Sequence, residues 1–339
     1  MIADLRSDTV TKPSQEMLEA MMNAEVGDDV FREDPTVLAL EERTAEIFGM
    51  EAGLFCPSGT MTNQIAIKTH TQPGDEILCD AAAHIYNYEG GGISFNSGAQ
   101  AKLIPGDKGR ISAKQVEENI NANFDWLTRT TLVSIENTVN RAGGSYYTLE
   151  QMKSVSEVCK KNKLKYHLDG ARIFNALEET KDKPADVGRL FDSISVCLSK
   201  GLGAPAGSVL VGSKNFIQQA RRIRKVFGGG MRQAGFMAAA GLYALNHNIH
   251  RLGEDHRRAK RLEAAVKTLP FLETILPVET NIIIFTLSDK MKSEDFIKKL
   301  ESQHIRASGF GKQSIRFVTH LDFDDTMLER TEKVLKSMA

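Results

Sequence analysis

One lysine, Lys200, stands at a point where the sequence gives a lysine little structural reason to be. It follows the apolar segment Ser193–Leu198 and opens a glycine-rich turn that reaches Gly207. Lysines are rarely buried without a partner, but an amine in a partly desolvated pocket has a lowered pKa and attacks carbonyl groups. The position therefore indicates a Schiff-base lysine. The alternative is a strand-end lysine whose amine only reaches water.

Two further segments offer the groups that a cofactor would need. Asp169 ends a second apolar segment, and an aspartate is the partner that keeps the pyridine nitrogen of pyridoxal phosphate protonated. The turn Ser58-Gly59-Thr60 leads into a helix, where N–H groups, a hydroxyl and a helix N-terminus suit a phosphate. Each has an ordinary alternative, because Asp169 would also cap the next helix and most such turns are N-caps. Lysine, carboxylate and phosphate cradle together indicate pyridoxal 5'-phosphate.

These residues must be positioned by a fold in which strands and helices alternate. Short apolar segments and helical patterns follow one another along the first 250 residues, which is typical of an α/β fold with a mostly parallel sheet. Ligands bind outside the carboxyl ends of the strands in such a sheet, where the turn at Ser58, Asp169 and Lys200 would meet. Strands are expected at 53–56, 76–80, 101–104, 131–135, 165–168, 193–198 and 208–212.

The pattern changes after a long charged helix expected at about 249–268. Two more strands and two more helices follow it and indicate a small α+β unit; they are expected at 281–286, 293–302, 314–318 and from Asp324 onward. We therefore expect two domains. The first, at 1–250, comprises an N-terminal arm and the large cofactor-binding α/β domain, and the second, at 251–339, is a small C-terminal α+β domain.

Composition narrows the classes of partner. The chain carries 43 Lys and Arg against 44 Asp and Glu, a balance that favours neither nucleic acid nor an anionic membrane as a partner. No apolar segment approaches the roughly 20 residues of a membrane span, and the polar N-terminus is unlike a secretory signal. The cysteines at 56, 79, 159 and 197 lack metal-ligand spacing, so no metal site is expected. These features predict a cytoplasmic protein with reduced thiols.

Longer motifs are spread over nearly the whole chain. They are Asp4–Thr11, Gly27–Val30, Asp34–Thr36, Pro57–Thr60, Ala83-His84, Glu136–Thr138, His167–Phe174, Cys197–Gly203, Gly228–Gln233 and Val318–Asp322. With these motifs the chain resembles the L-threonine aldolase family, the β-eliminating-lyase-like branch of fold type I pyridoxal phosphate enzymes. The resemblance implies an aspartate-aminotransferase-like large domain.

The resemblance also implies a role for each matching residue. Lys200 would hold the cofactor, Asp169 would bind the pyridine N–H, and His84 would stack on the ring. The other implied positions are a phosphate cradle of Ser58, Gly59 and Thr60 with Arg232 from across a subunit interface, and a substrate-carboxylate group of Ser7, Arg172 and Arg316, with Arg172 also near the cofactor. A planar guanidinium suits a carboxylate because it pairs with both oxygens. From the residues alone, Arg316 in an apolar strand would equally fit an internal salt bridge.

One departure from the family pattern concerns the base that removes the hydroxyl proton. Members of the family often carry a second active-site histidine where this chain has Trp126, and Glu-Asn-Thr-His becomes Glu136-Asn-Thr-Val139. An indole only donates hydrogen bonds, so Trp126 would offer an apolar wall to the substrate's β-substituent. Its alternative is packing beneath a loop. His84, directly or through a water, is then the expected base.

The implied reaction is the retro-aldol cleavage of L-threonine, L-allo-threonine and related β-hydroxy-α-amino acids to glycine and an aldehyde. Two alternatives stay on the same fold: β-elimination or transamination, and an aldolase that prefers phenylserine. A third is a non-catalytic protein that retains the fold, against which Lys200, Asp169, Arg172 and Arg316 argue together. The resemblance further implies a homo-oligomer, a tetramer built from dimers that share active sites.

Overall fold

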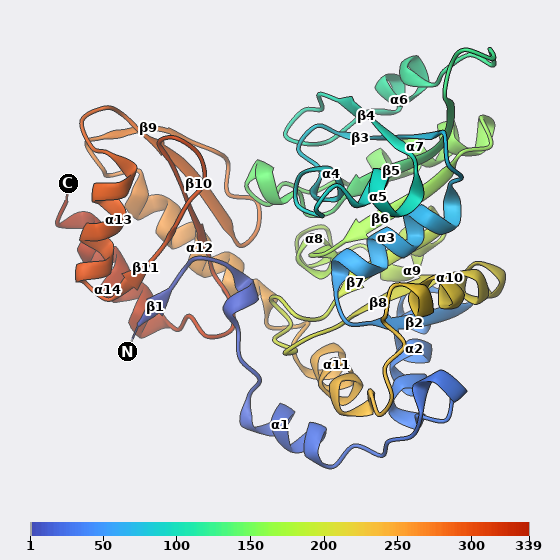
Figure 1. The fold of residues 1–339 in the computed structure, drawn as a ribbon. Helices are drawn as coiled ribbons and strands as arrows, with labels where there is room; N and C mark the ends of the chain where they lie inside the picture. The colour runs from blue at the N-terminus through green and yellow to red at the C-terminus, as the bar shows by residue number, and fades with distance from the viewer. Residues whose placement is uncertain (1, 339) are drawn as a thin grey trace.

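The computed structural model describes residues 2–338, and its main layer is a seven-stranded sheet (Figure 1). The strand order is β2-β8-β7-β6-β5-β3-β4, and β8 runs antiparallel to both of its neighbours while the other pairs are parallel. The strands are β2 (Ala52–Cys56), β3 (Asp75–Asp80), β4 (Gln100–Ile104), β5 (Arg129–Glu136), β6 (Lys165–Gly170), β7 (Ser193–Cys197) and β8 (Ser208–Gly212). The predicted α/β class with a mostly parallel sheet is confirmed.

Helices cover both faces of this sheet because its central strands are apolar on both sides. One hydrophobic cluster joins α3 and α10 to β2 and β8, and a larger one joins α2, α7 and α11 to the alternate residues of the same strands. The helices of this layer are α1 (Gln15–Met22), α2 (Pro35–Phe48), α3 (Gly59–His70), α4 (His84–Asn87), α5 (Gly92–Ser97), α6 (Ala113–Asn119), α7 (Leu149–Lys161), α8 (Ile173–Thr180), α9 (Pro184–Gly188), α10 (Lys214–Val226) and α11 (Gly235–His247).

Local signals in the sequence set several of these helix ends. The Asp34 side chain accepts the Val37 N–H ahead of α2, which begins with Pro35 and ends at Gly49 in the left-handed region, with φ of 61°. Thr148 and its partner Gln151 form the capping box expected at the start of α7. Both predictions are confirmed.

The rest of the chain builds a second, smaller layer, drawn in orange and red in Figure 1. Its antiparallel sheet has the order β12-β13-β10-β9 and its own hydrophobic cluster, in which Phe285 meets Phe296 and Phe317 edge to face. The elements are α12 (Leu252–Val266), β9 (Leu272–Ile275), β10 (Ile282–Leu287), α13 (Ser293–Ser302), β11 (Ile305–Arg306), β12 (Ser308–Gly309), β13 (Ser314–Val318) and α14 (Asp325–Lys336). The domain boundary near residue 250 stays a prediction.

The N-terminal arm links the two layers. Its strand β1 (Ala3–Asp4) pairs in parallel with β11, so the first residues of the arm lie with the C-terminal layer (Figure 1). A few residues further on, the Thr11 hydroxyl donates to the carbonyl of Lys200, which follows β7 in the large sheet. Residues 5–11 of the arm therefore run from the C-terminal layer to the large sheet. None of the described helices combines the length and the apolar character that a membrane span requires.

Candidate active site

Three parallel strands bring the predicted chemistry to one edge of the large sheet. Glu136 at the end of β5 lies opposite Asp169 at the end of β6, and Asp169 lies opposite Ser195 in β7. Lys200 follows β7 by three residues and is half-buried. This edge is the carboxyl end of the parallel strands, where such sheets bind their ligands.

Asp169 is buried and has a fixed orientation. Its Oδ1 accepts the N–H of Ala171 at 3.1 Å, but it does not cap α8, whose N-cap residue is Arg172. Its Oδ2 accepts Nδ2 of Asn63 from α3 at 2.9 Å. Both donors are neutral, so no cation of the described residues pairs with this carboxylate, and a protonated pyridine nitrogen would fit beside it.

The turn before α3 fits a phosphate. The Ser58 hydroxyl accepts the Met61 N–H, while the N–H groups of Gly59 and Thr60 stand at the helix N-terminus ahead of the intrahelical hydrogen bonds. A Cβ placed on Gly59 would lie 3.4 Å from the Ser208 hydroxyl oxygen, and that oxygen is buried without a hydrogen-bond partner among the described residues. An orphaned hydroxyl beside free N–H groups is suited to an anion such as the cofactor's phosphate. The residues present therefore fit pyridoxal phosphate.

His84 begins α4 and is held by an acid that the sequence analysis did not single out. Its Nδ1 lies 2.9 Å from Oε1 of Glu89, whose side chain is fully buried and also accepts from Asn63 and Gln64. Burial alone would lower the pKa of His84, but the hydrogen bond to Glu89 and the charges of Asp169 and Glu136 raise it overall. The only sequence signal for Glu89 is its place five residues after the histidine.

Asn63 connects the His84–Glu89 pair to the carboxylate of Asp169. It donates from one amide nitrogen to both Glu89 and Asp169, and its Oδ1 lies 3.1 Å from Nε2 of His167. The ligand atoms of His84, Glu89 and Asp169 all lie within 4.8 Å of one another. Because Asn63 and His84 already engage both carboxylates, hydrogen bonding accounts for this cluster.

Glu136 ties together two segments of the site. Its carboxylate accepts the backbone N–H of His84 at 2.9 Å and that of Asn140 at 3.0 Å. Burial and the neighbouring charge of Asp169 raise the pKa of Glu136 to about 7. Glu136 therefore fixes the backbone at His84 and at Asn140.

The arginines lie across a cavity of 560 Å³ that is also lined by Ser7, His84 and Lys200. Arg172 donates from Nε and Nη2 to Asp8, at 2.7 and 2.6 Å, so the ion pair leaves Nη1 outside both bonds. Arg316 donates to Asn140 Oδ1 and to the Arg6 carbonyl, and its Nε is buried without a partner. No ion pair neutralises Arg316 within residues 2–338.

Asp169 and the turn Ser58–Thr60 do not line this cavity, and neither do two exposed residues that were predicted to belong to the site, Arg232 and Trp126. Arg232 is exposed and paired with Asp28 at 2.9 Å. Trp126 is 78% exposed on the loop before β5, where it stacks on Phe124 with 4.8 Å between ring centroids. Neither side chain lines the cavity that contains Lys200, so their roles in the site stay predictions.

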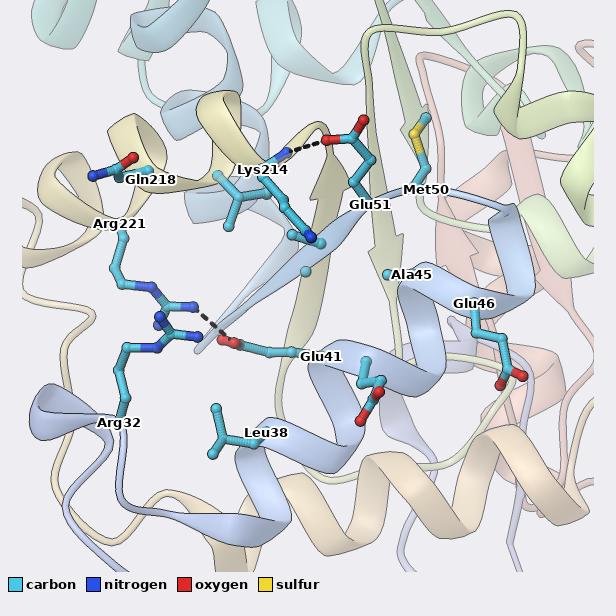
Figure 2. Close-up of a pocket in the computed structure, with 14 residues that line it drawn as sticks. Arg32, Leu38, Glu41, Ala45, Glu46, Met50, Glu51, Lys214, Gln218 and Arg221 are labelled. Carbon is cyan, nitrogen blue, oxygen red and sulfur yellow. Dashed lines mark hydrogen bonds and ion pairs between the residues drawn. The ribbon is translucent and has the colours of Figure 1, made fainter.

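A second and larger cavity, of 830 Å³, lies between α2, β2 and α10 (Figure 2). It contacts Ala52 and Gly53 at the start of β2 and Lys214 beyond the end of β8, and so lies at the sheet edge opposite Lys200. Among its lining residues, Arg221 and Glu41 form an ion pair of 2.7 Å that Figure 2 shows, and Glu51 accepts the backbone N–H of Lys214. We place the chemistry in the smaller cavity because it is lined by Lys200, His84 and the two predicted arginines and lies at the carboxyl ends of the parallel strands.

Similarity to known proteins agrees with this geometry. The sequence model of the family described as β-eliminating lyase matches residues 4–290. A probable low-specificity L-threonine aldolase 2 from Arabidopsis thaliana is 41% identical over 333 residues, covering 96% of this chain and 94% of the relative. A low specificity L-threonine aldolase from Escherichia coli K12 is 40% identical over 321 residues, covering 94% of each chain.

Solved structures share the fold. The threonine aldolase of Leishmania major has a TM-score of 0.86 at 21% identity and covers 99% of both chains. An aspartate aminotransferase from Rhizobium meliloti has a TM-score of 0.73 at 15% identity, covering 99% of this chain and 91% of the other. The predicted fold type I architecture and the predicted family are confirmed. The chain therefore belongs to the β-eliminating lyase family, in its low-specificity L-threonine aldolase branch, and is a carbon–carbon lyase.

Proposed function

We propose that this protein is a pyridoxal 5'-phosphate-dependent aldolase that cleaves L-threonine, L-allo-threonine and related β-hydroxy-α-amino acids to glycine and an aldehyde. The observation that carries the proposal is the convergence of Lys200, Asp169 and the His84–Glu89 pair at one strand edge, beside unpaired cations. Transamination and β-elimination on the same fold also need Lys200 and Asp169. The relatives, which are named threonine aldolases, favour aldol cleavage over both.

The residues that would hold the cofactor follow from the site. Lys200 would bind its carbonyl carbon, Asp169 its pyridine N–H, and the turn at Gly59 and Thr60 its phosphate, with the His84 ring against the pyridine. When bound there, pyridoxal phosphate supplies an electron sink for the pair released as the Cα–Cβ bond breaks.

The chain's own side chains orient the substrate and move its proton. Arg316, Nη1 of Arg172 and Ser7 face the cavity and bind the α-carboxylate, which fixes the direction of the Cα–Cβ bond. A carboxylate only accepts hydrogen bonds, so Nδ1 of His84 carries the ring proton and donates it in a hydrogen bond to Glu89, and Nε2 of the neutral ring keeps a lone pair. Nε2 takes the β-hydroxyl proton as the carbonyl of the departing aldehyde forms.

We also infer a cytoplasmic homotetramer whose subunits complete one another's sites. Arg232 and the Phe124–Trp126 pair lie exposed and outside their own cavity, and exposed aromatic pairs are typical of interfaces. In this assembly Arg232 reaches the phosphate of a neighbouring subunit, and Trp126 reaches its substrate.

A panel of β-hydroxy-α-amino acids, assayed for aldehyde and glycine with and without pyridoxal phosphate, tests the function. We expect cofactor-dependent cleavage of L-threonine and L-allo-threonine, and loss of both activity and the cofactor's visible absorption in Lys200→Ala. His84→Ala should lose the cleavage but keep the absorption. Keto-acid formation without aldehyde would refute the aldolase, and full activity in His84→Ala would remove the histidine as base.

A further inference from the structure

The cavity beside Lys200 holds more positive charge than an ordinary threonine site requires. Lys200, Arg141, Arg172 and Arg316 line it, and no aspartate or glutamate does. Asp8 neutralises Arg172. Arg141 forms no ion pair with any residue between 2 and 338.

The other free cations have partners in the proposed reaction. Lys200 meets the carbonyl of the cofactor, and Arg316 meets the α-carboxylate of the substrate. The phosphate belongs at Gly59 and Thr60, which do not line this cavity. Only Arg141 lacks an assigned anion.

Arg141 is held in place on the histidine side of the cavity. Its Nη1 donates to the Tyr88 hydroxyl at 3.1 Å, and the Tyr88 ring lies 5.5 Å from the ring of His84. The residue before it, Asn140, is fixed by its backbone bond to Glu136 and by its side-chain bond from Arg316. A guanidinium positioned in this way is preorganised for an anion.

The ring of Phe310 contacts two guanidinium groups. The carbon at the centre of the Arg141 guanidinium lies 5.8 Å from the Phe310 ring centroid, and that of Arg316 lies 4.8 Å from it. Both cations therefore border the same part of the cavity, and each has its own hydrogen-bond partners there, Tyr88 for Arg141 and Asn140 for Arg316. Arg141 contacts Tyr88, whose ring packs against His84, so Arg141 is the free cation on the side of the cavity where the β-carbon and its hydroxyl would lie.

We propose that Arg141 is a specificity residue that binds an acidic β-substituent, so that the enzyme cleaves β-hydroxyaspartate in addition to neutral substrates. This rests on the proposed aldolase function and names a further substrate class for the same site. The Cα–Cβ bond of β-hydroxyaspartate breaks, its electron pair remains with Cα, and the hydroxyl proton leaves to the base. Cα then takes up a proton, so that one dicarboxylate yields one glyoxylate and one glycine.

The test compares substrates that have the same shape and different charge. kcat/KM of the holoenzyme is measured for β-hydroxyaspartate, its uncharged amide β-hydroxyasparagine, and L-threonine. Arg141 is exposed in this subunit, so we expect Arg141→Gln to lower the value for β-hydroxyaspartate by about fivefold, the upper end for a charge pair at an exposed side chain. The values for the amide and for threonine should change by less than about threefold, and Arg141→Lys should recover part of the loss because it keeps the charge.

Binding gives a readout that does not depend on catalysis. L-Aspartate and L-asparagine lack the β-hydroxyl, and calorimetry of the holoenzyme should show tighter binding of aspartate, with the preference lost in Arg141→Gln and weakened by salt. Arg222→Gln, which removes the same charge from the exposed side of α10, should keep the preference.

The possible results separate the two proposals. Equal losses for all three substrates in Arg141→Gln, or unchanged values for β-hydroxyaspartate and for aspartate binding, would overturn the anion site while leaving the aldolase intact. A wild-type enzyme that cleaves no threonine but still prefers aspartate over asparagine in the Arg141-dependent way would overturn the aldolase and support the anion site.

Discussion

Replacing Glu89 by glutamine tests whether this buried acid sets the strength of the proposed base. Glu89 accepts from His84, Asn63 and Gln64, at distances of 2.9, 2.9 and 2.6 Å. Glutamine has nearly the same shape and still offers one oxygen to His84, but it carries no charge. The substitution therefore keeps the packing and removes the charge that raises the pKa of His84.

The structure gives both the size and the direction of the effect. A hydrogen bond to a charged group is worth about 1.5–3 kcal/mol and a neutral one about 0.5–1.5 kcal/mol. The difference of about 1–1.5 kcal/mol, applied to the imidazolium that forms in the transition state, lowers kcat/KM for L-threonine roughly tenfold. The base works only when neutral, so a lower pKa of His84 also moves the acidic limb of the pH profile to lower pH.

The assay is the pH profile of kcat/KM for wild type and Glu89→Gln. Glu76→Gln is the matched control, because Glu76 is a buried, hydrogen-bonded acid in β3 at the opposite edge of the sheet. We expect the control to leave the acidic limb where it is. A Glu89→Gln profile that falls uniformly without a shift of that limb would show a purely structural role, and an unchanged profile would refute the His84–Glu89 pair altogether.

Two other substitutions test the N-terminal arm and the exposed loop. Burial would raise the pKa of Asp8, yet Arg172 lowers it to about 2. The ion pair therefore stabilises the folded state fully at pH values above 3.8, the pKa of Asp8 in the unfolded chain. This stabilisation is lost as the pH falls toward 2. Asp8→Asn should lower the free energy of unfolding by about 3–5 kcal/mol at neutral pH, as the loss of one partner does in other buried ion pairs. Thermal melts should show that the difference from wild type becomes smaller in acid. A loss of stability that does not depend on pH would contradict this. For Trp126→His, we expect kcat/KM to shift from phenylserine toward threonine and allo-threonine, and an unchanged preference would remove Trp126 from the substrate pocket.

Much of the large sheet could be predicted because its signals are local. Apolar segments of strand length, bounded by glycine, proline and capping residues, mark β2 to β8, and Lys200 and Asp169 are conspicuous because each is a charge at the end of such a segment. The short helix α4 and the two-residue strands β1 and β11 escaped prediction. Their stability comes from contacts with distant parts of the chain, and so few residues show no periodicity.

Two of the site residues that the sequence analysis missed, Glu89 and Asp8, act through another residue. Glu89 is one acid among many in the sequence and matters because α4 and its neighbouring turn bring it to Nδ1 of His84. Asp8 lies in a recognised motif, but its pairing with Arg172 across 164 positions becomes visible only in three dimensions. The sequence points to groups that would touch a ligand, whereas the structure is needed to show what holds them.

The way in which buried acids pair with some groups of the cavity and not with others explains how the cavity would select for anions. Asp8 and Glu89 are buried. Asp8 orients Arg172 and Glu89 orients His84, and both of these side chains face the cavity. The cations that receive no such acid, Lys200, Arg141 and Arg316, are the ones left to meet charges from outside the chain. Because the cavity walls are partly apolar, unpaired cations there attract anions more strongly than they would in water. A substrate with two carboxylates would pair with Arg141 and Arg316 at once. A neutralising substitution at Arg141 removes the second of these anion sites and leaves the chemistry at Lys200 in place.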